Sequence, residues 1–93
     1  MSELASVQVA VYGRVQGVFF RAFAASRSRE LGLTGYACNL PGGAVEIQAE
    51  GKREQLEKLI SYLRVGPPAA KVERVVTKWS EYTGSYSGFN IKY

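Results

Sequence analysis

The residues best suited to chemistry stand in one glycine-containing segment, residues 13–21, which reads Gly-Arg-Val-Gln-Gly-Val-Phe-Phe-Arg. Glycines at positions 13 and 17 allow the backbone to turn tightly with its amide groups exposed, and such a loop can bind an anion. Arg21 could add a guanidinium that holds two phosphate oxygens at once. The segment therefore indicates a phosphate site, although an arginine in a first helical turn is more often a solvated surface residue.

A second candidate is Asn39, which lies in the segment Gly-Tyr-Ala-Cys-Asn-Leu-Pro-Gly-Gly-Ala-Val-Glu at residues 35–46. A carboxamide can accept a hydrogen bond from water and so orient it. On residue type alone, however, Asn39 is more often a strand-end residue that satisfies local backbone groups. The neighbouring Cys38 would point to the opposite face of a strand, because side chains alternate. We therefore expect no thiol nucleophile beside Asn39.

The hydrophobic pattern predicts the elements that position these two segments. Alternating apolar residues indicate strands, and apolar residues at helical spacing indicate helices. In chain order these are a strand at 7–12, a helix at 20–31, strands at 34–40 and 45–49, a helix at 52–64 and a strand at 71–82. Adjacent Val75 and Val76 interrupt the last alternation and could mark a β-bulge. Residues 89–93 alternate again and could add a short strand.

The order β-α-β-β-α-β predicts an α+β protein of the ferredoxin-like type, a sandwich of one sheet and two helices. Right-handed crossovers would place both helices on one face of an antiparallel sheet. We expect one domain over residues 1–93. If the strand at 45–49 pairs between the first two strands, Asn39 faces the loop that ends the first strand. Fold alone leaves the activity open.

The composition excludes several classes of enzyme. The 93-residue chain has no histidine and one cysteine, so the usual metal-ligand clusters, Ser/His or Cys/His dyads and an internal disulfide cannot be assembled. Glu46 and Glu50 are expected on the exposed face of a strand and Glu54 in the first turn of a helix, where it complements the helix dipole. We therefore expect no metal site.

Charge and hydropathy restrict the partners. The net charge is +4, but basic residues stand among acidic ones and form no dense run of the kind that binds nucleic acid. No stretch approaches the roughly 20 apolar residues of a membrane span, and the N-terminus has no signal-peptide pattern. We expect a cytoplasmic protein that binds neither nucleic acid nor membrane.

Two motifs give a more specific indication. Residues 13–21 closely resemble the acylphosphatase signature Gly-x-Val-Gln-Gly-Val-x-Phe-Arg, and every fixed position matches. Residues 35–46 are similar to the second motif of that family, and residues 66–73 to its connection between the second helix and the fourth strand. The departures are Cys38, where the family often has a basic residue, and Gly42, where it often has Asp. Neither removes a catalytic group.

The resemblance implies hydrolysis of the carboxyl-phosphate bond of acyl phosphates to a carboxylate and inorganic phosphate. Water would attack phosphorus without a metal, a cofactor or a covalent intermediate. By similarity Arg21 binds phosphate, Asn39 positions the water, and the phosphate-binding loop is made of the backbone amides of Gln16, Gly17, Val18, Phe19 and Phe20. The expected partners are a small acyl phosphate and inorganic phosphate, the product and a competitive inhibitor, and the expected state is a monomer.

Two other classes of function stay open at the level of the sequence. A ferredoxin-like sheet with exposed aromatic residues can bind single-stranded RNA, and a basic chain would favour this. A noncatalytic phosphate-binding or maturation module, like the acylphosphatase-like domain of larger proteins, is the second alternative. Lys92 and Tyr93 could approach the site if the last strand packs near it, but the sequence assigns them no role.

Overall fold

The computed structural model describes residues 3–93, so the first two residues of the predicted domain lie outside it. The elements follow the predicted order. They are β1 (Leu4–Arg14), α1 (Phe20–Glu30), β2 (Thr34–Asn39), β3 (Val45–Lys52), α2 (Arg53–Val65), β4 (Lys71–Ser80) and β5 (Phe89–Lys92). The described residues contain no helix that is long and apolar enough to cross a membrane.

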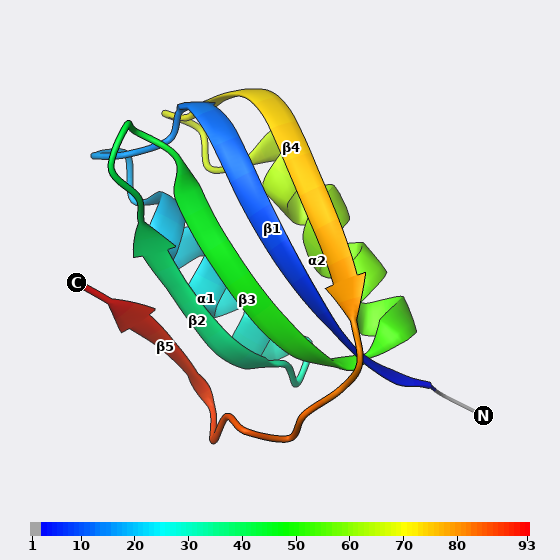
Figure 1. Cartoon of the computed structure of the whole chain (residues 1–93). Helices are drawn as coiled ribbons and strands as arrows, with labels where there is room; N and C mark the ends of the chain where they lie inside the picture. The colour runs from blue at the N-terminus through cyan, green and yellow to red at the C-terminus, as the bar shows by residue number, and fades with distance from the viewer. Residues whose placement is uncertain (1–2) are drawn as a thin grey trace.

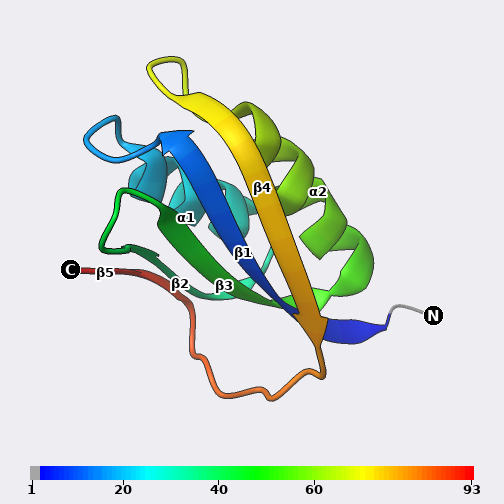
Figure 2. The same cartoon turned by 45° about the horizontal axis from the view of Figure 1, so that its top comes forward.

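The five strands form one sheet in the order β4-β1-β3-β2-β5, and both helices cover the same face of it (Figures 1 and 2). The pairs β4–β1, β1–β3 and β3–β2 are antiparallel, which confirms the ferredoxin-like prediction. The residues at the C-terminus form the fifth strand. It pairs with β2 in parallel, so the complete sheet is mixed.

The core lies between the sheet and the helices. Val7, Val9 and Val11 of β1 are fully buried, as their alternation predicts. Both helices turn apolar side chains onto this layer, because residues three or four apart share one helical face. The helical core residues are Phe20, Ala24 and Ala25 of α1 and Leu56, Leu59, Ile60 and Leu63 of α2.

The irregularity in the β1–β4 pair lies next to the loop and not at Val75 and Val76. Tyr12 pairs with Arg74 and Gly13 with Val72, so Glu73 is the extra residue of a bulge. A Cβ atom on Gly13 would lie 2.2 Å from the carbonyl oxygen of Lys71, so only glycine permits this close approach of the two strands. The bulge bends β4 beside the point where β1 enters the loop.

The expected exposure of Glu50 is wrong. Its side chain points to the face of the sheet that carries no helix, as predicted, but only 1% of the residue is exposed. The connection between β4 and β5 covers it there, with Thr83 and Gly84 donating hydrogen bonds to its carboxylate. Strand alternation correctly predicted the face, but the covering segment is more than 30 residues away along the chain.

Candidate active site

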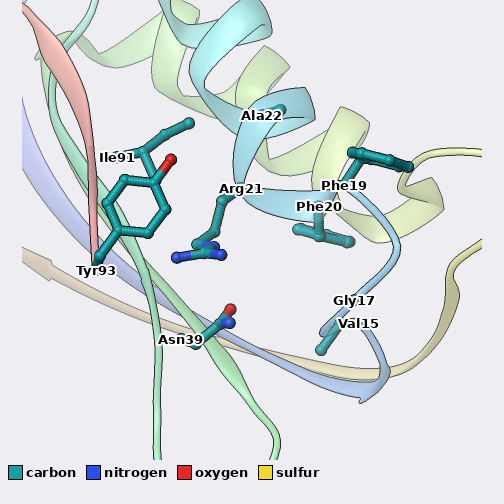
Figure 3. Close-up of a pocket in the computed structure, with 9 residues that line it drawn as sticks. All are labelled: Val15, Gly17, Phe19, Phe20, Arg21, Ala22, Asn39, Ile91 and Tyr93. Atoms are coloured by element: carbon teal, nitrogen blue, oxygen red, sulfur yellow. The ribbon is translucent and has the colours of Figure 1, made fainter.

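One pocket of about 260 Å³ opens where the β1–α1 loop, the end of β2 and the end of β5 meet (Figure 3). Arg21 and Asn39 both line this pocket, although 18 positions separate them in the sequence. The lining also includes part of the loop and the end of the last strand. The complete lining is Val15, Gly17, Phe19, Phe20, Arg21, Ala22, Asn39, Ile91 and Tyr93.

The backbone of the β1–α1 loop is bent into left-handed conformations at two places. Gly17 has a φ of 76° and Phe19 a φ of 64°, and Phe19 is the N-cap of α1. It supplies no side-chain acceptor to the first amides of the helix, and the first turn has no acidic residue. The first helical amides and the positive end of the helix dipole are therefore available to an external anion.

Three of the five predicted loop residues, Gly17, Phe19 and Phe20, line the pocket, while the side chain of Val18 packs against the hydrophobic core. The side chain of Gln16 points instead to the β2–β3 turn. Its Nε2 donates to the carbonyl oxygens of Leu40 at 2.9 Å and Ala44 at 2.8 Å.

Arg21, in the first turn of α1, contacts the end of β5. Its Nη1 donates a hydrogen bond of 3.2 Å to the carbonyl oxygen of Lys92, and its guanidinium carbon lies 4.7 Å from the ring centroid of Tyr93. An arginine has five N–H donors, so these contacts orient the guanidinium and leave it donors for an anion. Figure 3 shows the guanidinium near the centre of the group of lining residues.

Asn39 is the last residue of β2, and its side chain is exposed to the pocket. Figure 3 shows its carboxamide pointing toward the guanidinium of Arg21. The two meet because β3 pairs between β1 and β2, as predicted. The end of β2 therefore lies at the same edge of the sheet as the loop after β1.

The cysteine beside Asn39 lies outside this pocket. The Sγ of Cys38 is 3.9 Å from Oε1 of Glu46, which also accepts a 2.8 Å hydrogen bond from the hydroxyl of Tyr36. Burial, and then the nearby Glu46 carboxylate, raise the pKa of Cys38. Burial and the same carboxylate also raise the pKa of Tyr36. The thiol is thus held in its unreactive, protonated form.

The sequence assigned no role to three contributors to the site. Ile91 was missed, and Lys92 and Tyr93, which were expected to approach the site only if the last strand packed near it, contribute a carbonyl oxygen and a ring. Their alternation predicted a strand but not the edge of the sheet to which it would add. Within residues 3–93 no group of three or more Cys, Asp or Glu side chains is placed to hold a metal ion.

The β-α-β-β-α-β order, with both helices on one face of the sheet, defines a small ferredoxin-like α+β protein. The sequence model of the family described as acylphosphatase matches residues 7–91. The chain belongs to the acylphosphatase family, the enzymes that hydrolyse acyl phosphates.

Relatives support this assignment over nearly the whole chain. An acylphosphatase of Thermus thermophilus is 52% identical over 81 residues, which are 87% of this chain and 91% of that protein. The crystal structure of acylphosphatase from Bacillus subtilis is 33% identical with a TM-score of 0.92, and the match covers 98% of this chain and 100% of that one. Full-length HypF in a phosphate- and nucleotide-bound form matches at 26% identity with a TM-score of 0.88, covering 99% of this chain but 12% of HypF.

Proposed function

We propose that this acylphosphatase acts by in-line attack of water on phosphorus, with no covalent intermediate and no metal. Arg21 and the backbone amides of residues 16–20 would hold the phosphoryl group, and Asn39 would hold the water. The observation that best supports this is that Arg21, Asn39 and the loop line one pocket.

The chemistry of acyl phosphates requires few catalytic groups. The conjugate acid of the leaving carboxylate has a pKa of about 4, so the carboxylate departs without a strong general acid. The transition state of phosphoryl transfer is largely loose, with charge spread over the phosphoryl oxygens. Fixed donors aimed at that charge, here a guanidinium and a row of amides, can supply the stabilisation. The lack of histidine in the sequence is consistent with this mechanism.

Asn39 would place the nucleophile without acting as a base. Its carboxamide oxygen can accept a hydrogen bond from water and hold the water oxygen in line with phosphorus. The proton can pass to a phosphoryl oxygen of the substrate itself. Because Figure 3 shows the carboxamide directed at Arg21, a water on Asn39 and a phosphate on Arg21 would be neighbours.

We further propose that the substrate is a small acyl phosphate and that inorganic phosphate, the product, inhibits competitively in the same cradle. The chain would act as a monomer in the cytoplasm. A single cysteine, which has no partner for an internal disulfide, suits a reducing compartment. Light scattering on the purified chain measures its mass, and a dimer would contradict the monomer.

The direct test is hydrolysis of benzoyl phosphate in the presence of EDTA by the unmodified chain and by Arg21→Ala and Asn39→Ala. Asn39→Ala should lose about 10²–10³ in kcat and keep most of its affinity for inorganic phosphate. Arg21→Ala should lose both activity and phosphate inhibition, because it removes binding in the ground state and in the transition state.

A suitable control is Arg53→Ala, which removes an arginine of α2 that stacks on Trp79 of β4 and does not line the pocket. It should leave both readouts unchanged. Unchanged turnover in Asn39→Ala would refute the water-positioning role. A folded wild-type chain that binds phosphate but hydrolyses no acyl phosphate would be a binding module instead.

A further inference from the structure

The connection between β4 and β5, residues 81–88, carries the chain from one edge of the sheet to the other. It contains no helix or strand, and Figure 2 shows it passing below the ends of the intervening strands. An unstructured segment of this length has many conformations unless specific contacts restrict it. The position of β5 therefore depends on what holds the connection.

Glu50 at the end of β3 binds this connection. Its Oε2 accepts hydrogen bonds from the backbone N–H of Thr83 at 3.0 Å and from the Oγ1 hydroxyl of Thr83 at 2.7 Å. Its Oε1 accepts one from the backbone N–H of Gly84 at 2.9 Å. The residue is 1% exposed, and a buried carboxylate is costly unless such donors satisfy it. Both of its oxygens are bonded to the connection.

The same connection then leads into a strand that ends at the active site. Gly35 of β2 donates to the carbonyl oxygen of Gly88, and Arg29 of α1 donates two hydrogen bonds, 3.1 and 2.8 Å long, to that of Phe89. Three residues later the carbonyl oxygen of Lys92 accepts from Arg21. The backbone from Thr83 to Lys92 thus links the carboxylate of Glu50 to the guanidinium of Arg21, and it is held by hydrogen bonds at both of its ends.

We propose that Glu50 is a positioning residue for Arg21. By fixing Thr83 and Gly84, it sets the place of β5 along β2 and hence where the Lys92 carbonyl and the Tyr93 ring meet the guanidinium. The inference rests on the phosphate-binding role proposed for Arg21. Glu50 itself does not line the pocket, and in this proposal its effect on Arg21 passes through the connection and β5.

The test measures the inhibition constant of inorganic phosphate and the hydrogen exchange of residues 89–93 in two variants. Thr83→Ala removes the hydroxyl bond to Glu50 and the two bonds that Ser85 donates to that hydroxyl, and it should raise the inhibition constant about threefold. Glu50→Ala removes all three bonds and should raise it about tenfold. In both variants the amides of β5 should exchange faster, because the strand is less restrained.

A double-mutant cycle with Tyr93→Ala separates positioning from general destabilisation. If Glu50 acts through β5, Thr83→Ala should weaken phosphate inhibition by clearly less in the Tyr93→Ala background than in the wild type. Ile60→Val is the matched control, since it weakens the core in α2, the helix that packs on β1, β3 and β4. It should leave phosphate inhibition unchanged.

Two results would overturn the proposal. One is wild-type phosphate inhibition in folded samples of both Thr83→Ala and Glu50→Ala. The other is a double variant, Thr83→Ala with Tyr93→Ala, whose inhibition constant rises by the product of the two single-variant increases, which would mean that the two residues act independently. Arg21→Ala is measured in parallel. Retained phosphate inhibition in that variant would instead refute the proposed function of Arg21, while hydrogen exchange would still report whether Glu50 holds β5.

Discussion

The side-chain amide of Gln16 donates to the carbonyl oxygen of Leu40 at 2.9 Å, and this hydrogen bond ties the β1–α1 loop to the residue that follows Asn39. A second bond, to Ala44 at 2.8 Å, spans the other side of the β2–β3 turn. The loop proposed to hold phosphate and the residue proposed to hold water are thereby joined by one side chain. A constellation fixed in this way needs little reorganisation at the moment of reaction.

Gln16→Ala should reduce both stability and turnover. The carbonyl groups of Leu40 and Ala44 each lose one hydrogen bond and keep one from a backbone N–H of the turn, so the free energy of unfolding should fall by about 1–2 kcal/mol. The loop is also no longer held at a fixed position relative to Asn39, and we expect kcat for benzoyl phosphate to fall about tenfold. Gln48→Ala is the control, because its amide donates to Ser6 on the face of the sheet that carries no helix, away from the pocket. Equal kcat losses in the two variants would contradict the role of Gln16.

Tyr93→Ala should weaken phosphate inhibition, while Tyr93→Phe should preserve it. The ring of Tyr93 lies 4.7 Å from the guanidinium carbon of Arg21, and an exposed contact of this kind contributes about 0.5–1 kcal/mol. We therefore expect the inhibition constant to rise about threefold in the alanine variant. Tyr62→Ala removes a similar contact, with Arg27 at 4.8 Å, away from the pocket. An effect of equal size there would argue against a local cause.

Phe19→Gly should stabilise the protein. Phe19 is the one non-glycine residue among the described residues with a positive φ, and 83% of it is exposed, so its side chain gains little from packing. A left-handed conformation costs a non-glycine residue about 1–2 kcal/mol, which glycine avoids. Urea unfolding should therefore show a gain of about 1 kcal/mol. Phe19→Ala keeps the strained backbone, and a gain as large in that variant would contradict the explanation.

Glu50 should make stability depend on pH in the acid range. Burial raises the pKa of this carboxyl, but hydrogen bonds from Thr83 and Gly84 outweigh burial and lower it below its ordinary value of 4.5. A lowered folded-state pKa contributes stability that is present above pH 4.5 and is lost as the pH falls through the folded value.

Glu50→Gln should therefore be less stable than the wild type at pH 7 and lose less stability on acidification below pH 4.5, as measured by urea unfolding at a series of pH values. Glu57→Gln is the control, because its ion pair with Arg53 is exposed and such pairs contribute little. If the Glu50→Gln curve ran parallel to that of the wild type below pH 4.5, the carboxylate would not be the titrating group.

The sequence predicted the order of the elements because their periodicities are local. Val7, Val9 and Val11 alternate within one strand, and Leu56, Leu59 and Leu63 repeat within one helix, so a short window of sequence contains the whole signal. The glycine and arginine positions of residues 13–21 are equally local. The bulge was misplaced because it depends on how Gly13 approaches Lys71 on another strand.

By itself, then, the sequence determined the fold class, the family resemblance and the two residues, Arg21 and Asn39, that lie in the pocket. Only the tertiary structure decided that β5 adds to β2 in parallel, that the ring of Tyr93 contacts the guanidinium of Arg21 and that the connection before β5 buries Glu50. The physical reason is that strand pairing at a sheet edge and burial of a carboxylate depend on partners far away in the chain. Hydrophobic periodicity indicates which face a side chain takes, but it does not indicate which distant segment covers that face.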